Sequence, residues 1–171
     1  MDIKSTRRWS DIHNLAVVTL NDGKKVGTVE DFYFDPQTSM IPALLVKTGM
    51  FGRRALMSSA VNAFGGDAVT TANESMLVSE KNNTQLQTLP LGQDLLSYRV
   101  MSESGTVIGT IGNILLDVNV PNTARIAAFE MSGGLRERLS NHYPTFEANS
   151  VRRYGQDVIV ISDAVALELS Q

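Results

Sequence analysis

The sequence of 171 residues has no cysteine and only two histidines, His13 and His142. The lack of cysteine excludes disulfides, thiolate metal sites and cysteine nucleophiles. Neither histidine has a metal-ligand spacing to another ligand residue type, the nearest pair being Asp11 and His13, so we expect no bound metal. Phosphate-binding loops, dinucleotide fingerprints and serine-nucleophile elbows are also missing. We therefore expect neither a cofactor nor an enzyme.

Long apolar runs and a strong charge of one sign are missing as well. No segment reaches the roughly 18 apolar residues needed to cross a bilayer, and the N-terminus has no signal-peptide core, so we expect a cytoplasmic protein. The net charge of −3 gives no basic footprint for nucleic acid, which is not expected as the main partner. Arg7-Arg8-Trp9 would allow a weak peripheral contact with a membrane surface. The alternative is a surface pair beside a packed tryptophan.

The chain instead repeats one pattern. Residues 18–35 match residues 100–117 at a shift of 82, and with insertions residues 41–44 and 61–69 match residues 126–129 and 151–159. A repeat of this kind predicts one module used twice. We expect one domain over residues 1–80, a polar linker over 81–93 and a second domain over 94–171. The matched pairs include Gly23 and Gly105, Gly27 and Gly109, and Asp35 and Asp117.

Strand signals dominate each copy. The run 15–20 is followed by Asp22-Gly23, a strong hairpin signal, and the second copy has Gly105 at that place. The next segments, 26–35 and 108–117, have apolar residues at spacings of three, three and two, which no flat strand can place on one face. We predict strands that bend or bulge at Gly27 and Gly109, as small barrels require. The predicted fold class is mainly β, with two tandem small antiparallel β-barrels and short helical turns.

The remaining elements follow from turn and capping signals. Asp35 and Asp117 each precede a turn, where an aspartate accepts hydrogen bonds from nearby backbone amides. Third strands are predicted at 41–46 and 126–131, and final strands at 68–72 and 158–161. Residues 58–65 and their counterpart 148–155 are typical of a capped helical turn closed by glycine. We further predict a short helix over 163–169, and packing by the leucines that follow the linker's polar start.

These motifs have a characteristic order. A hairpin glycine precedes Val26-Gly27-Thr28-Val29-Glu30-Asp31-Phe32 and Asp35; an apolar strand, a loop, Val61 and Gly65-Gly66-Asp67-Ala68-Val69 follow. The order resembles the PRC-barrel family over about residues 9–78 and again over 92–162. That family includes the cytoplasmic domain of the photosynthetic reaction-centre H subunit and the C-terminal domain of the ribosome maturation factor RimM.

The resemblance implies small barrels that hold other proteins or organise assemblies, without a common catalytic apparatus. It thus implies a non-catalytic adaptor for a protein partner, in a membrane-associated or ribonucleoprotein assembly. A homo-oligomer, in which the partner is a second copy of the chain, is an alternative. A second hypothesis is an RNA-processing or ribosome-maturation factor that binds RNA or a ribosomal protein.

Two segments are candidates for the partner surface, because arginine and aromatic residues on loops of a rigid scaffold are a usual makeup of contact patches. The alternative interpretation is that their apolar members cover barrel ends or the seam between barrels. The candidate residues are Met50, Phe51, Arg53 and Arg54 in the first segment, and Leu135, Arg136, Arg138, His142 and Tyr143 within residues 133–144 of the second.

Overall fold

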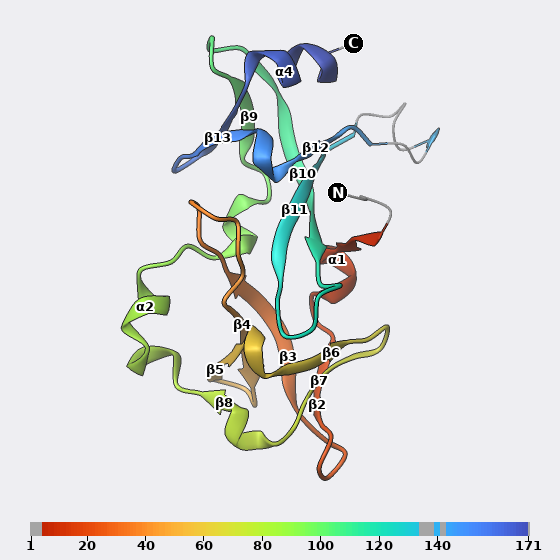
Figure 1. Ribbon diagram of the computed structural model, residues 1–171, viewed down its shortest axis with the longest axis vertical. Helices are drawn as coiled ribbons and strands as arrows, with labels where there is room; N and C mark the ends of the chain where they lie inside the picture. The colour runs from red at the N-terminus through yellow and green to blue at the C-terminus, as the bar shows by residue number, and fades with distance from the viewer. Residues whose placement is uncertain (1–4, 134–138, 141–142, 171) are drawn as a thin grey trace.

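The computed structural model describes residues 5–133, 139–140 and 143–170 of the chain. This described part is mainly β and contains two seven-stranded sheets, which lie one above the other in Figure 1. Its α-helices are short: α1 (Trp9–Ile12), α2 (Thr84–Gln87) and α4 (Asp163–Leu169). The 3-10 turns are η2 (Ser58–Ala60), η3 (Glu74–Met76), η4 (Glu80–Asn82), η5 (Gly92–Leu95) and η6 (Ala148–Ser150).

The first sheet is built from the first half of the chain, in the order β6-β7-β2-β3-β4-β5-β8. Strands β2 to β5 pair consecutively and antiparallel, as do β6 and β7, while β8 pairs with β5. A parallel pair of β2 with β7 joins the two parts of the sheet. The strands are β2 (Ala16–Thr19), β3 (Lys24–Tyr33), β4 (Ala43–Thr48), β5 (Gly52–Met57), β6 (Val61–Phe64), β7 (Ala68–Thr71) and β8 (Leu77–Val78).

The second sheet repeats this order as β12-β11-β10-β9-β14-β13, again with one parallel pair, β9 with β14. A further strand from the start of the chain, β1 (Arg7–Arg8), pairs with β10. The strands are β9 (Arg99–Ser102), β10 (Val107–Asp117), β11 (Arg125–Met131), β12 (Thr145–Glu147), β13 (Val151–Tyr154) and β14 (Val158–Ile161).

The bulged strands predicted at 26–35 and 108–117 are confirmed. In β3 the pairing register shifts beside Gly27 and again between Val29 and Asp31, and in β10 it shifts beside Gly109 and again between Ile111 and Asn113. Each shift lets one extra residue into the strand, which bends the sheet and increases its twist. Both sheets therefore curl around the same buried core. The hairpin glycines are also confirmed, because Gly23 and Gly105 have φ of +65° and +95°.

Three expectations need correction. The sheets are not purely antiparallel, since β2–β7 and β9–β14 run parallel. The helical turn expected over 58–65 ends at Ala60, and β6 follows it; η6 and β13 repeat this in the second copy. The equivalence before each hairpin is shifted by one residue, because Val17 pairs with Val69 as Val100 pairs with Ile159. The final strands and the terminal helix α4 are confirmed.

The two halves of the chain exchange their leading segments. Arg7 and Arg8 pair with Leu116 and Leu115 of β10, in the second half. In return, Leu91 pairs with Tyr33 of β3, in the first half. The turns after β3 and β10 also meet, since Ile41 N donates to Ala124 O and Ile126 N donates to Ser39 O. These reciprocal contacts relate the copies by an approximate two-fold axis.

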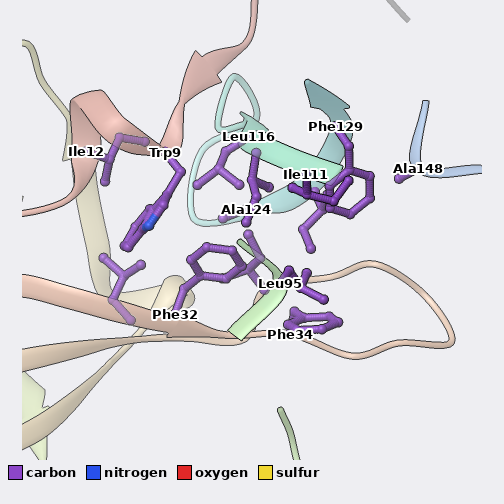
Figure 2. Close-up of a cluster of buried hydrophobic side chains, with 14 of the residues drawn as sticks. Trp9, Ile12, Phe32, Phe34, Leu95, Ile111, Leu116, Ala124, Phe129 and Ala148 are labelled. Atoms are coloured by element: carbon purple, nitrogen blue, oxygen red, sulfur yellow. The ribbon is translucent and has the colours of Figure 1, made fainter. Parts of the chain in front are cut away.

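One continuous apolar core fills the space between the copies. Figure 2 shows Trp9, Phe32 and Phe34 of the first half together with Ile111 and Phe129 of the second. A chain of ring contacts crosses the seam, with Phe34 and Phe129 both packed against Tyr154 at centroid distances of 5.4 and 6.1 Å. A smaller cluster under the connection buries Leu86 and packs Leu89 and Leu91, as expected for the leucines that follow the linker's polar start.

Candidate functional site

The β4–β5 hairpin of the first copy ends in an apolar tip. Met50 is 81% exposed and Phe51 is 93% exposed, more than any other large hydrophobic residue that the structure describes. The turn before them has a φ of +64° at Gly49, which only glycine adopts at little cost. Polar residues normally occupy such turns, and neither Met50 nor Phe51 contributes to the buried core. The exposure of Met50 and Phe51 therefore does not support the alternative interpretation, in which these side chains cover a barrel end or the seam between barrels.

Cationic side chains surround this tip. Lys47 of β4 lies directly opposite Arg53 of β5, and Val46 lies opposite Arg54. Like charges at directly opposed strand positions are destabilising, so this pair works against the fold rather than for it. Lys81 of the following connection lines the same hollow. We call Lys47, Met50, Phe51, Arg53, Arg54 and Lys81 the hairpin surface.

Two acidic groups lie beside this surface, and one of them pairs with Arg53. Glu30, the extra residue of the β3 bulge, places its Oε2 atom 3.0 Å from Arg53 Nε. Glu80 accepts a hydrogen bond of 2.9 Å from the Tyr33 hydroxyl. Burial and this hydrogen bond raise the pKa of Tyr33 above its ordinary value, so the phenol stays protonated and keeps donating. Within the described residues, Lys47, Arg54 and Lys81 form no ion pair.

The hairpin surface borders an open hollow of about 710 Å³. Its lining includes four cationic residues and two acidic ones, Glu30 and Glu80, on a chain whose net charge is −3. This local excess of positive charge suits an anionic contact, and the apolar tip suits a hydrophobic pocket on the partner. No three His, Asp or Glu side chains are grouped to hold a metal ion in the part of the chain that the structure describes.

The second candidate segment is only partly visible. Leu135, Arg136, Arg138 and His142 lie outside the described residues. Leu139 is 79% exposed and Tyr143 is half-buried. In Figure 1 the described part of this segment lies near β12 at the upper right, while β4 and β5 lie at the lower left. The described part of the second segment therefore lies apart from β4 and β5.

Several other residues that the sequence singled out serve the backbone. The carboxylates of Asp35 and Asp117 accept from the amides of Gln37 and Asn119, at 2.9 and 3.0 Å, so their turn role is confirmed. In the Arg7-Arg8-Trp9 cluster the tryptophan is packed, with 1% exposure, while Arg7 donates to Phe64 O and Arg8 donates to Glu130.

Asp31 and its counterpart Asn113 join the two copies. Asp31 Oδ1 accepts from the amides of Phe32 and Gln93, at 2.8 and 2.9 Å. Asn113 Oδ1 accepts in the same way from Ile114 and Ser10, at 2.9 and 3.3 Å. Each side chain thus caps the leading segment of the other copy. Sequence reasoning missed this role, although the acid-to-amide change between copies was a signal that charge is not required.

Replacing Asp31 by asparagine should change how stability depends on pH. Burial raises the pKa of Asp31 in the folded chain, against a lowering by its two backbone hydrogen bonds. A protonated Asp31 therefore favours folding; this stabilisation is full below the unfolded-state pKa of about 3.9 and is lost as pH rises through the folded-state pKa. We expect Asp31→Asn to be more stable than the native chain at neutral pH, and to lose this advantage in acid.

Urea unfolding of both proteins between about pH 3 and about pH 7 measures this difference. Asp35→Asn makes the same chemical change at a carboxylate that accepts from an amide of its own turn, and it serves as the control. An Asp31→Asn midpoint that stays below the native one at neutral pH would contradict the expectation, because it would mean that the folded state needs the charge.

Comparison with known proteins identifies the first copy. The family model of the PRC-barrel domain matches residues 5–77, which contain the leading segment, the first sheet up to Leu77 and the whole hairpin surface except Lys81. A search of curated proteins finds no match to the chain. None of the helices in the described residues is long and apolar enough to cross a lipid bilayer. Residues 5–77 of the chain therefore match the PRC-barrel domain, the family that the motif order indicated.

Proposed function

We propose that the protein is a non-catalytic interaction and assembly module that holds an acidic protein partner on its hairpin surface. The observation that carries the proposal is the exposed pair Met50 and Phe51 between four cationic residues. An interaction role is also what the PRC-barrel domain suggests at the level of the family. Buried aromatic anchors supply most contact energy at interfaces, while surrounding charges steer the partner and set its orientation.

The comparison of the two copies supports this choice of surface. Features that serve the fold occur in both, such as the bulges, the hairpin glycines and the Asp31–Asn113 caps. At the described positions of the equivalent hairpin the charged residues differ: by strand register, Tyr143 and Pro144 replace Arg53 and Arg54, and Gly112 replaces Glu30. A feature that the second copy folds without is not required for folding.

The proposal includes a second PRC-type barrel over the second half. Its strand order and parallel pair repeat those of the first half. This arrangement would present one rigid, doubled scaffold, with the hairpin surface at one end only.

A double variant tests the contact. Arg53→Glu/Arg54→Glu should reduce capture of the protein partner from cell extract at least about ten-fold, because it places like charges against an acidic surface. Arg152→Glu/Arg153→Glu is the matched control, since these exposed neighbours on β13 give the same change in net charge in the other copy. Equal capture by both double variants and the native chain would remove the hairpin surface from the proposal.

The same experiment addresses an RNA-associated role, the alternative suggested by family resemblance. Capture that disappears after ribonuclease treatment and falls steeply with salt would favour RNA, since phosphate contacts release counterions. Capture that survives ribonuclease supports the protein partner.

A further inference from the structure

In the first copy an arginine of the chain itself fills the space beside the β6–β7 turn. Arg7 Nη1 donates to Phe64 O at 2.7 Å, and Arg7 Nη2 donates to Gly65 O at 2.9 Å. The two guanidinium nitrogens therefore satisfy two successive carbonyls. Charge-assisted hydrogen bonds of this kind are about twice as strong as neutral ones.

The second copy has a proline at the equivalent position. Arg7 lies opposite Leu116 in β10, and Pro90 O accepts from Phe34, the counterpart of Leu116 in β3. The register on either side agrees, because Leu91 pairs with Tyr33 as Arg8 pairs with Leu115. Farther along, Asn14 and Ser97 share the same unusual φ, 71° and 77°. Pro90 thus takes the place of Arg7.

A cavity of about 130 Å³ lies at this place. Its lining includes Pro90 together with Tyr154 and Gly155, the counterparts of Phe64 and Gly65. Water takes up about 30 Å³ per molecule in the liquid, so the cavity has room for about four heavy atoms. Proline carries no side-chain donor, and it therefore cannot repeat what Arg7 does.

The remaining walls suit a planar cation. Phe34 and Tyr154 pack against each other at 5.4 Å, and Tyr98 completes the aromatic side. Figure 2 shows Phe34 beside Leu95, another wall residue. Asp94 brings one carboxylate, and its negative charge helps to raise the pKa of Tyr98, after burial, the larger cause. Guanidinium groups stack on aromatic faces and pair with carboxylates, which ammonium groups do less well.

We propose that this seam cavity binds the guanidinium group of an arginine side chain supplied by a partner protein. The bound group would donate to the carbonyls of Tyr154 and Gly155 as Arg7 donates to those of Phe64 and Gly65. The site lies between the copies and shares no residue with the hairpin surface, so it is a second contact that is independent of the first.

The direct test is an NMR titration of the intact chain with N-acetyl-L-arginine methylamide. We expect saturable amide shifts at Leu95, Tyr154 and Gly155. The lysine and citrulline analogues, which lack the guanidinium fork or its charge, should give shifts roughly ten-fold smaller at equal concentration. Equal shifts with either analogue, or no saturable shift with arginine, would overturn the proposal. If free L-arginine binds but the capped N-acetyl-L-arginine methylamide does not, the assignment to a protein side chain is overturned.

Two variants add an internal check. Pro90→Arg supplies the missing side chain from within, and should abolish binding while unfolding at a temperature no lower than the native chain. Pro121→Arg, at an exposed turn, is the matched control and should bind as the native chain does. Asp94→Asn should weaken binding several-fold. Unchanged arginine affinity in both Pro90→Arg and Asp94→Asn would contradict the assigned cavity.

Discussion

Replacing Gly92 by valine is expected to lower the free energy of unfolding by about 3 kcal/mol, at the upper end of the usual overpacking range. A Cβ atom at this position would lie 2.0 Å from Cζ of Phe32 and 2.3 Å from its Cε1. Phe32 is fully buried and packs edge-on against Trp9 at 4.8 Å, so the ring has no free space to move into. Denaturation in urea, followed by tryptophan fluorescence, measures the loss.

The position of Gly92 gives this substitution its effect. Gly92 begins η5, the leading segment of the second copy, yet the ring it contacts belongs to the first copy. Gly66→Ala is the matched control, because a Cβ there would meet nothing within 4 Å, and its effect should stay within about 0.5 kcal/mol. A valine at 92 that costs no more than this control would mean that the contact between η5 and β3 is not tightly packed.

Much of the secondary structure could be predicted from the sequence, because its signals are local. The Asp-Gly pair fixed the first hairpin, the broken apolar spacing indicated the bulges of β3 and β10, and Ser162 capped α4 as a serine before an acidic first turn should. The motif order was enough to identify the family that matches residues 5–77.

The arrangement of the copies could not be predicted, because it depends on contacts distant in sequence. A two-residue strand such as β1 carries no periodic signal, and its partner lies more than 100 residues away. The parallel pair β2–β7 likewise joins segments that no hairpin connects. The β6 strand was mistaken for helix because Ser58 and Ser59 signal a cap, and the turn they begin is a 3-10 turn of three residues.

The candidate site was predicted in part. Met50 and Phe51 were singled out from the sequence as contact residues; the structure shows that both are exposed, and their role in a contact stays a prediction. Arg53 and Arg54 belong to β5 rather than to a loop, since the strand begins at Gly52. The seam cavity could not be found from sequence, because the equivalence of Pro90 with Arg7 follows from strand register. One position holds arginine and the other proline, so the residue types give no sign that the positions are equivalent.

Separating the halves is expected to unfold both. Residues 1–80 alone lack Leu95 of η5 and Leu86, whose side chains are 2% and 1% exposed in the intact chain. Residues 81–171 alone lack Trp9 and Ile12, which are 1% and 0% exposed. Each fully buried side chain of this kind contributes about 1.5–3 kcal/mol. Losing two of them, with the caps at Asp31 and Asn113, removes much of the roughly 5–15 kcal/mol that stabilises a typical small protein.

We infer that the two copies stabilise each other by exchanging their leading segments. Calorimetry of fragments 1–80 and 81–171, each alone and then mixed in equal amounts, tests it most directly. We expect no cooperative transition from either fragment and one shared transition from the mixture. A fragment 1–80 that unfolds cooperatively by itself, at a temperature that adding the other half does not change, would contradict the claim.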